Sequence, residues 1–262
     1  MKHLKVAVII LYVVMISGCQ KMTTLSSAER QEAPTQTNNK ILIDASRDGG
    51  VWWFPQSSET GFSSNADHQG KQLADYLRGQ GYEVYELARG TTITDDLLNQ
   101  YDKVIRAGGF GTYTSSEITA YDHFINRTSS LILLQDHLSN YANDNLSEHL
   151  GVQFAGGLGG IITEFTSNPI TRGVTSLSYM FGSVVINAPK NTTMTILGSF
   201  DSSVSFDANN SGEFDNGDIS SPAVMGILNS YPDCRIFFMG DINALETLPQ
   251  PFVYNLIQWA FK

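Results

Sequence analysis

Asp136 and His137 come directly after the short apolar run 131–134, and a histidine beside a carboxylate can carry out acid–base chemistry. Histidine titrates near neutral pH, and a carboxylate can orient its ring and stabilise its charged form. His68 and Asp44 would extend this pair if the fold brings the four side chains together. Adjacency in sequence does not place side chains, and Asp136 could instead cap the segment that follows. Asp136, His137 and His68 are therefore candidates for catalysis, with a structural role as the alternative.

Two adjacent tryptophans, Trp52 and Trp53, lie in the segment after the first apolar run of the folded region. A carbohydrate cleft needs flat apolar faces and a few polar groups that fix the orientation of the ligand. Such groups lie in the same segment or after later strands: Asp44, Arg47, Asp48, Gly109 and Gln135. Together with the tryptophans they form the predicted ligand-binding set. The alternative is that one indole belongs to the core and the other covers the base of the loop.

The segment 207–218 places oxygen-bearing groups at alternate positions, with Gly212 where such a loop must turn sharply. This spacing resembles the calcium loop of EF-hands, in which about six to eight oxygen atoms surround the ion. The ligands implied are Asp207, Asn209, Ser211, the backbone carbonyl of Glu213, Asp215 and Asp218. Asp218 is shorter than the usual glutamate, and the flanks are not helical in pattern. We expect a structural calcium ion in an insertion at 200–221; an ordinary acidic turn is the alternative.

Strand-like and helix-like patterns alternate through the first half of the folded region. Short apolar runs predict strands at 41–43, 82–85, 103–107 and 131–134. Helical spacing and capping residues predict helices at 67–78, 95–99, 115–126 and 144–150. The second half has strand-like pieces at 184–186, 194–197, 223–228 and 236–239 and a final helix at 251–261. The glycines at 156–160 predict a flexible loop.

This alternation predicts an α/β fold, with a flavodoxin-like, mostly parallel sheet, helices on both faces and a mixed, strand-rich second half. In an open sheet of this kind, ligands bind beyond the carboxyl ends of the strands. The candidate residues after the first, third and fourth predicted strands would then converge at one edge.

The amino-terminal segment has the pattern of an export signal. Lys2 and Lys5 precede an apolar run from Val6 to Ile16, which is shorter than the ~20 residues of a membrane-spanning helix. The small residues before Cys19 resemble the lipobox of bacterial lipoproteins, which implies cleavage at 18/19 and acylation of Cys19. A chance cysteine in a plain signal peptide or membrane anchor is the alternative.

The residues that follow Cys19 set the expected organisation and location. Residues 19–39 are polar and predict a flexible tether, and residues 40–262 form the globular domain. Gln20 is not the aspartate that is associated with retention in the inner membrane of some bacteria. We therefore expect the protein at the cell envelope, anchored by lipid to the outer membrane, on its periplasmic or surface face.

Composition narrows the class of partner. The formal net charge of −10 argues against nucleic acid, whose phosphates require neutralisation by Lys and Arg. Only two cysteines are present, and if Cys19 carries lipid, Cys234 has no partner for a disulfide within the chain. The apolar run after Cys234 predicts a buried, inert thiol; a catalytic thiol is the alternative.

The order of several motifs resembles the class I glutamine amidotransferase-like fold, in its divergent branches that include trehalose-utilisation-like proteins. The motifs are Ile41–Asp44, Arg78–Val84, Tyr101–Ile105, Glu117–Phe124, Ser130–Leu134 and Asn168–Val174. In true amidotransferases of this fold a cysteine occupies the sharp turn after a central strand. The corresponding turn here, Leu134–His137, has no cysteine and no flanking glycines. The resemblance therefore implies the fold without amidotransferase chemistry.

Three functions agree with these patterns. The leading hypothesis is a non-catalytic, lipid-anchored domain that binds a carbohydrate, another small polar ligand or an envelope partner protein. The second is an envelope hydrolase that uses Asp136 and His137. The third is a structural subunit whose cleft is vestigial.

Overall fold

The structure is a computed structural model that describes residues 39–53, 67–138, 144–188, 193–213 and 215–262. These residues belong to one compact unit, Asn38–Lys262; a second unit comprises Met1–Thr37. The predicted leader and tether, with Cys19, therefore fall outside the described residues except for Asn39.

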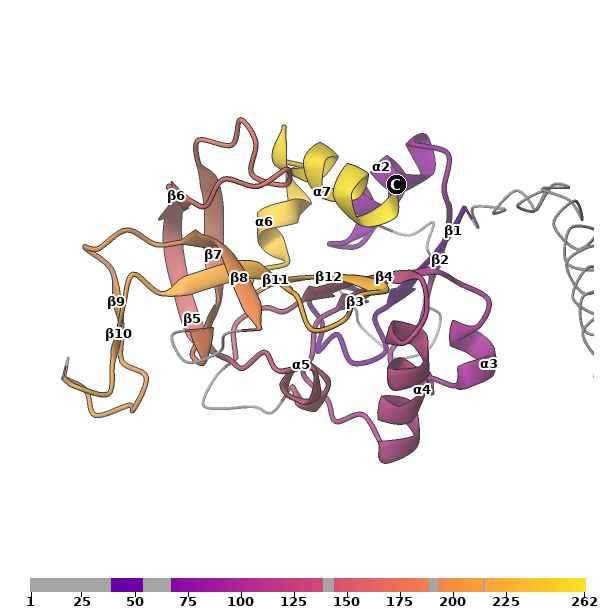
Figure 1. Cartoon of the computed structure of the whole chain (residues 1–262), viewed down its shortest axis with the longest axis horizontal. Helices are drawn as coiled ribbons and strands as arrows, with labels where there is room; N and C mark the ends of the chain where they lie inside the picture. The colour runs from indigo at the N-terminus through magenta and orange to yellow at the C-terminus, as the bar shows by residue number, and fades with distance from the viewer. Residues whose placement is uncertain (1–38, 54–66, 139–143, 189–192, 214) are drawn as a thin grey trace, which may run out of the picture. The chain divides into compact units, whose positions relative to one another are not determined.

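A mixed eight-stranded sheet forms the centre of the described unit (Figure 1), in the order β2-β1-β3-β4-β12-β11-β8-β6. The bounds are β1 (Lys40–Asp44), β2 (Glu83–Glu86), β3 (Lys103–Ala107), β4 (Ser129–Leu134), β12 (Cys234–Met239), β11 (Ala223–Leu228), β8 (Met194–Ser199) and β6 (Glu164–Phe165). The strands from β2 to β12 run parallel, and β11, β8 and β6 each pair antiparallel with the preceding neighbour. The parallel part has the flavodoxin-like order, so the predicted fold class is confirmed, including its mixed second half.

Helices cover both faces of the sheet (Figure 1). On one face lie α2 (Lys71–Gly79), α6 (Asn243–Glu246) and α7 (Phe252–Phe261), and on the other lie α3 (Asp95–Leu98), α4 (Ser115–Ile125) and α5 (Asn145–Leu150). Successive side chains of a strand point to opposite faces. Accordingly, Ile41 and Ile43 belong to the first of these two apolar layers and Leu42 to the second.

Local signals in the sequence explain where several helices begin and end. Thr94 caps α3 by accepting a hydrogen bond from the backbone N–H of Leu97. Thr114 caps α4 and forms a reciprocal capping box with Glu117. Asp144 caps α5, which ends at Gly151 in the left-handed conformation.

Two ribbons lie outside the central sheet. β5 (Phe154–Ile162) pairs antiparallel with β7 (Leu177–Val185), and β9 (Ser205–Phe206) pairs with β10 (Ile219–Ser220). The flexible loop predicted for the glycines at 156–160 is therefore wrong, since these residues belong to β5. Their backbone pairs with β7 across register shifts, and the missing side chains leave room for Phe200, Phe181 and Phe206.

Candidate functional site

A pocket opens beside the carboxyl ends of β4 and β12, where an open α/β sheet is expected to bind ligands. Its volume is about 440 Å³. The lining residues are Gly49, Gly50, Val51, Gln69, Asp136, His137, Met180, Phe181 and Asn243. The predicted pair Asp136–His137 therefore does face a pocket, and residues of the β5–β7 ribbon form another part of its wall.

Asp136 fixes the ring of His137. The Nδ1 atom of His137 lies 2.7 Å from Asp136 Oδ1, and the same oxygen accepts the backbone N–H of His137 at 2.6 Å. The ring contacts those of Phe110 and Phe181, whose centroids lie 5.9 and 5.8 Å away. Asp136 is buried, whereas the His137 side chain is 47% exposed. The imidazole is thus oriented by a carboxylate and remains open to a ligand.

Asp241 is a second carboxylate at this edge, and sequence reasoning missed it. It follows β12 after Gly240, is fully buried, and accepts hydrogen bonds from the backbone N–H groups of Met180 and Asn243. The pKa of Asp241 is raised to about 6, chiefly by burial; the hydrogen bond from Met180 opposes this shift and the nearby charge of Asp136 supports it. The signal was present, because Asp241 follows the apolar run 236–239 just as Asp136 follows 131–134.

Phe181 has an unusual backbone conformation at the rim of the pocket. Its φ of 79° is in the left-handed region, which costs a bulky residue about 1–3 kcal/mol. The residue nevertheless remains 58% exposed beside His137. It lies against Gly157, where a Cβ atom would come within 2.9 Å of it. An exposed aromatic residue that the fold holds in a strained backbone conformation points to a function for its position.

Asp44, Arg47 and Asp48, three of the predicted ligand-binding residues, are held by other protein groups. The hydroxyls of Tyr113 and Tyr121 donate to Asp44 at 2.8 and 2.6 Å, Arg47 pairs with Glu117 at 2.9 Å, and Arg89 pairs with Asp48 at 2.6 Å. Asp48 also accepts the backbone N–H groups of both tryptophans. These residues organise the loop after β1 and do not line the pocket, so their contact with a ligand stays a prediction.

Trp52, Trp53 and His68 form a buried cluster instead of an aromatic cleft wall. Both indoles are at most 1% exposed; Trp52 Nε1 donates to Glu86 and Trp53 Nε1 to the backbone carbonyl of Leu87. The ring of His68 packs against Trp53 at a tilt of 48°, with the centroids 4.5 Å apart, and its Nε2 lies 3.2 Å from Glu86 Oε2. Burial lowers the pKa of His68, although Glu86 opposes this shift. Trp52 and Trp53, predicted to bind a ligand, and His68, a candidate for catalysis, are buried and do not line the pocket.

Gly109 and Gln135 belong to a buried polar network below the edge of the sheet. Gln135 accepts the backbone N–H of Gly109 at 3.0 Å and donates to Asp144 at 2.9 Å. Asp144 in turn pairs with the buried Arg106 at 2.5 Å. Of the residues predicted to act on a ligand, Asp136 and His137 are therefore the two that line the pocket.

The acidic segment forms a closed loop at the end of the β9–β10 ribbon. Asp207 accepts the backbone N–H groups of Ser211 (3.0 Å) and Gly212 (2.7 Å), and Gly212 has a φ of +84°. Asn209 donates to Asp215 at 2.7 Å, so these side chains meet inside the loop. Among the residues that the structure describes, no group of three or more His, Cys, Asp or Glu side chains is arranged to hold a metal ion.

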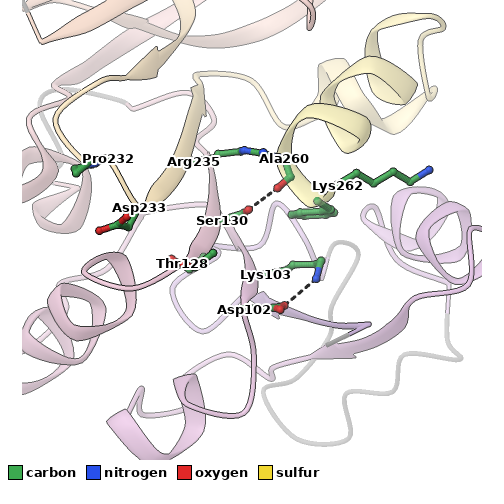
Figure 2. A pocket seen from close by; sticks show the side chains of 11 residues that line it. Asp102, Lys103, Thr128, Ser130, Pro232, Asp233, Arg235, Ala260 and Lys262 are labelled. Atoms are coloured by element: carbon green, nitrogen blue, oxygen red, sulfur yellow. Dashed lines mark hydrogen bonds and ion pairs between the residues drawn. The ribbon is translucent and has the colours of Figure 1, made fainter. Parts of the chain in front are cut away.

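A second pocket, of about 320 Å³, lies at the opposite edge, beside the amino ends of β3, β4 and β12 (Figure 2). Ser130 donates to the carbonyl of Ala260 there, and Lys103 pairs with Asp102 at 2.8 Å. Arg235 donates to the carbonyl of Trp259 at 2.7 Å. Ser130 and Arg235 thus satisfy carbonyls at the end of α7, a capping role.

Cys234 is buried at the start of β12, and burial raises the pKa of its thiol to about 11. The thiol is therefore protonated at neutral pH, as an inert core residue should be. No helix within the described ranges is long and apolar enough to cross a membrane.

No family model and no curated protein matches the sequence. Solved structures are similar to it at low identity. The N-terminal domain of mmIFT52 matches with 14% identity and a TM-score of 0.59, over 85% of this chain and 97% of that one. A ThuA-like protein from Bacteroides uniformis matches with 12% identity and a TM-score of 0.53, over 86% and 91%. A cytoplasmic protein from Salmonella typhimurium matches with 15% identity and a TM-score of 0.51, over 84% and 98%. The chain therefore has a fold similar to that of ThuA-like proteins.

Proposed function

We propose that this domain binds a small polar ligand with a flat apolar face, such as a carbohydrate, in the pocket between Asp136–His137 and Phe181. The observation that carries the proposal is the exposed Phe181, held by a left-handed backbone beside an imidazole that Asp136 orients. Sugar rings stack their C–H faces on aromatic rings and use their hydroxyls for hydrogen bonds. Gln69 and Asn243, which also line the pocket, supply further polar groups.

The residues of this chain fit ligand binding better than they fit amidotransferase catalysis. The turn 134–137 contains no cysteine, and the thiol of Cys234 is buried in another strand. A hydrolase that uses Asp136 and His137 is the second candidate, favoured by the 2.7 Å contact that orients the imidazole. In that case His137 would act as the general acid or base, and the ligand would be turned over.

Replacing the aromatic side chain at the rim tests the binding proposal. We expect Phe181→Ala to weaken the binding of the best ligand of a mono- and disaccharide panel by about two- to tenfold, because a lost aromatic contact costs about 0.5–1.5 kcal/mol. The affinities are measured by calorimetry or ligand-detected NMR, with Tyr254→Ala, an exposed aromatic on α7, as the control.

Three outcomes of the panel experiment contradict simple binding. If no ligand binds to the wild type, the result favours a structural subunit or a protein-binding domain over a carbohydrate-binding domain. If Phe181→Ala binds as tightly as the wild type, the pocket is misassigned. If the wild type hydrolyses a ligand and Asp136→Asn slows the reaction at least about 100-fold, the domain is a hydrolase.

The loop 207–218 is proposed to bind calcium as a structural ion. Asp207 already accepts the N–H groups expected of the first position, and Gly212 makes the sharp turn. Asp215 and Asp218 would leave their backbone N–H partners and turn their oxygens toward the ion. The ion would offset the repulsion between the loop's carboxylates.

Thermal unfolding tests the calcium site. We expect millimolar calcium to raise the midpoint of the wild type, since a ligand at about 100 times its Kd stabilises by about 2.7 kcal/mol. Asp207→Ala should lose this shift, whereas Asp201→Ala, an exposed carboxylate that caps a turn outside the loop, should keep it. An unchanged midpoint in the wild type, or an equal shift with Asp207→Ala, would rule out the site.

The location of the domain is also a proposal. Cleavage before Cys19 and acylation of its thiol and amino group would tether the acidic domain to the envelope through residues 19–39. Mass spectrometry of the native protein should find the acylated cysteine at the new amino terminus; an uncleaved leader or a free thiol would contradict the anchor.

A further inference from the structure

The β5–β7 ribbon exposes a strip of large apolar side chains. Ile161, Met180 and Phe181 are 62%, 57% and 58% exposed. Across the described part of the chain, the other exposed large apolar side chains are Tyr85 on β2 and Tyr254 on α7, which lie on separate elements. The apolar surface is thus concentrated on one ribbon, and contiguous patches of this kind mark binding surfaces.

The register of the ribbon places the side chains of Met180 and Ile161 side by side. Met180 pairs with Gly159, and Ser178 pairs with Ile161. Directly opposed residues, and residues two apart on a strand, share a face, so Met180 and Ile161 are diagonal neighbours on the outer face. Gly159 contributes no side chain between them. Tyr179 points to the opposite face, where it packs against Phe200.

The strip is continuous with the pocket. Met180 and Phe181 line the pocket together with Asp136 and His137, while Ile161 extends the strip beyond it. Phe181 belongs to both regions, and its left-handed backbone turns the ring toward His137. The polar end and the apolar end of one ligand could therefore be bound on one surface.

The ribbon also carries no charge. Neither strand, with sequences FAGGLGGII and LSYMFGSVV, contains an Asp, Glu, Lys or Arg residue. The protein as a whole has a net charge of −10. An uncharged surface in an acidic protein suits an uncharged alkyl or acyl chain better than a charged peptide, because the ribbon has no charged side chain that could form an ion pair with a partner.

We propose that the ligand of this site is an amphiphile, whose polar head occupies the pocket and whose alkyl or acyl chain lies along Phe181, Met180 and Ile161. The inference rests on the proposed function, in which the pocket binds the polar head of the ligand. We expect in addition that the affinity rises with the length of the ligand's alkyl chain, since burying one methylene group fully contributes about 0.8 kcal/mol, or about fourfold in affinity. On an open strip the gain per methylene is smaller.

Paired glycosides test the inference on the full chain. The probes are the methyl and octyl β-glucosides and β-maltosides, below their micelle concentrations, with octanol as a chain without a head. We expect at least one octyl glycoside to bind about tenfold or more tightly than its methyl partner. Ile161→Ser should remove most of this gain and leave the affinity for the methyl glycoside unchanged, because Ile161 lies outside the pocket. Ile161→Val and Tyr254→Ser should keep the gain.

The outcomes separate this inference from the function on which it rests. If methyl and octyl glycosides bind equally, the amphiphile is excluded and the binding function stands. If octanol binds as tightly as the octyl glycoside, the sugar head contributes nothing and the amphiphile is excluded. If Ile161→Ser keeps the full gain in affinity, the alkyl chain of the ligand does not lie on the strip. If no glycoside of either length binds, both the inference and the proposed carbohydrate site fail.

Discussion

Asp144→Ala should lower the free energy of unfolding by about 3–5 kcal/mol, the cost of leaving a buried charge without its partner. Arg106, near the end of β3, is fully buried, and its guanidinium donates to Asp144 at 2.5 Å and to Ser147 at 2.6 Å. Its Nε and its other terminal nitrogen have no hydrogen-bond partner in the described residues. Asp144 also caps α5 and accepts from Gln135, so its removal disrupts the network below the ligand edge.

Equilibrium denaturation of the full-length variants measures this effect. The matched control is Asp122→Ala, which breaks a surface pair with His149 and should cost at most about 1 kcal/mol. Replacing both partners with apolar residues, as in Arg106→Met with Asp144→Leu, should recover much of the loss, since no charge is then buried. If Asp144→Ala lies within 1 kcal/mol of the wild type, the charge of Arg106 is compensated by another group or by solvent.

The fold was predictable because the local patterns and the buried layers agree. In β1, three consecutive apolar residues, Ile41–Ile43, require burial on both faces, and a parallel sheet with helices on each side provides it. Thr94 and Gly151 marked helix ends by their own chemistry. The glycine-rich strand β5 was not predictable, since glycine has no side chain whose periodicity could reveal a strand.

The position of the candidate site at the carboxyl ends of the strands was predictable, but the residues that line it were not. Strand order brings the residues after β1, β3 and β4 to one edge, yet it does not fix where each side chain points. Asp44 is bound by tyrosines 69 and 77 residues away, a contact that only the tertiary structure reveals. The tryptophans were assigned to a ligand site because polar residues lie in the same segment, but one of these residues, Asp48, accepts their backbone N–H groups in the loop that buries them.

Phe181 and Asp241 lie at the site, although the sequence shows no motif in the segments that contain them. Nothing in the sequence indicates that Phe181 has a positive φ, and the ribbon that presents it was expected to be a loop and a short strand. Asp241 became part of the site because β12 pairs parallel with β4, which places both strand ends side by side. Its buried carboxyl group then holds the backbone of Met180, the residue before Phe181.

The free energy of unfolding should fall by about 2–3 kcal/mol between pH 4 and pH 7 because of Asp241 alone. Its pKa is about 6 in the folded protein, against 3.8 as the ordinary value. In this range the native state keeps a proton that the unfolded state has released, so stability decreases as the pH rises and the loss is complete above about pH 6. The groups around it agree with this direction: Asp136 is a nearby negative charge, and Tyr179 is a buried phenol whose pKa is raised well above 10.

Asp241→Asn isolates this titration. The variant loses part of the hydrogen bonding to the backbone of Met180 and Asn243 at every pH, since an amide offers a single acceptor oxygen. The stability of the variant relative to the wild type should nevertheless rise by about 2–3 kcal/mol from pH 4 to pH 7, because the variant carries no carboxyl group to ionise. Asp201→Asn is the control: hydrogen bonds from Ser203 lower the pKa of this exposed carboxyl, so its relative stability should be flat above pH 4. A flat difference for Asp241→Asn would mean that the carboxyl group ionises in the folded protein as easily as in the unfolded chain, and that its burial beside Asp136 is relieved by solvent.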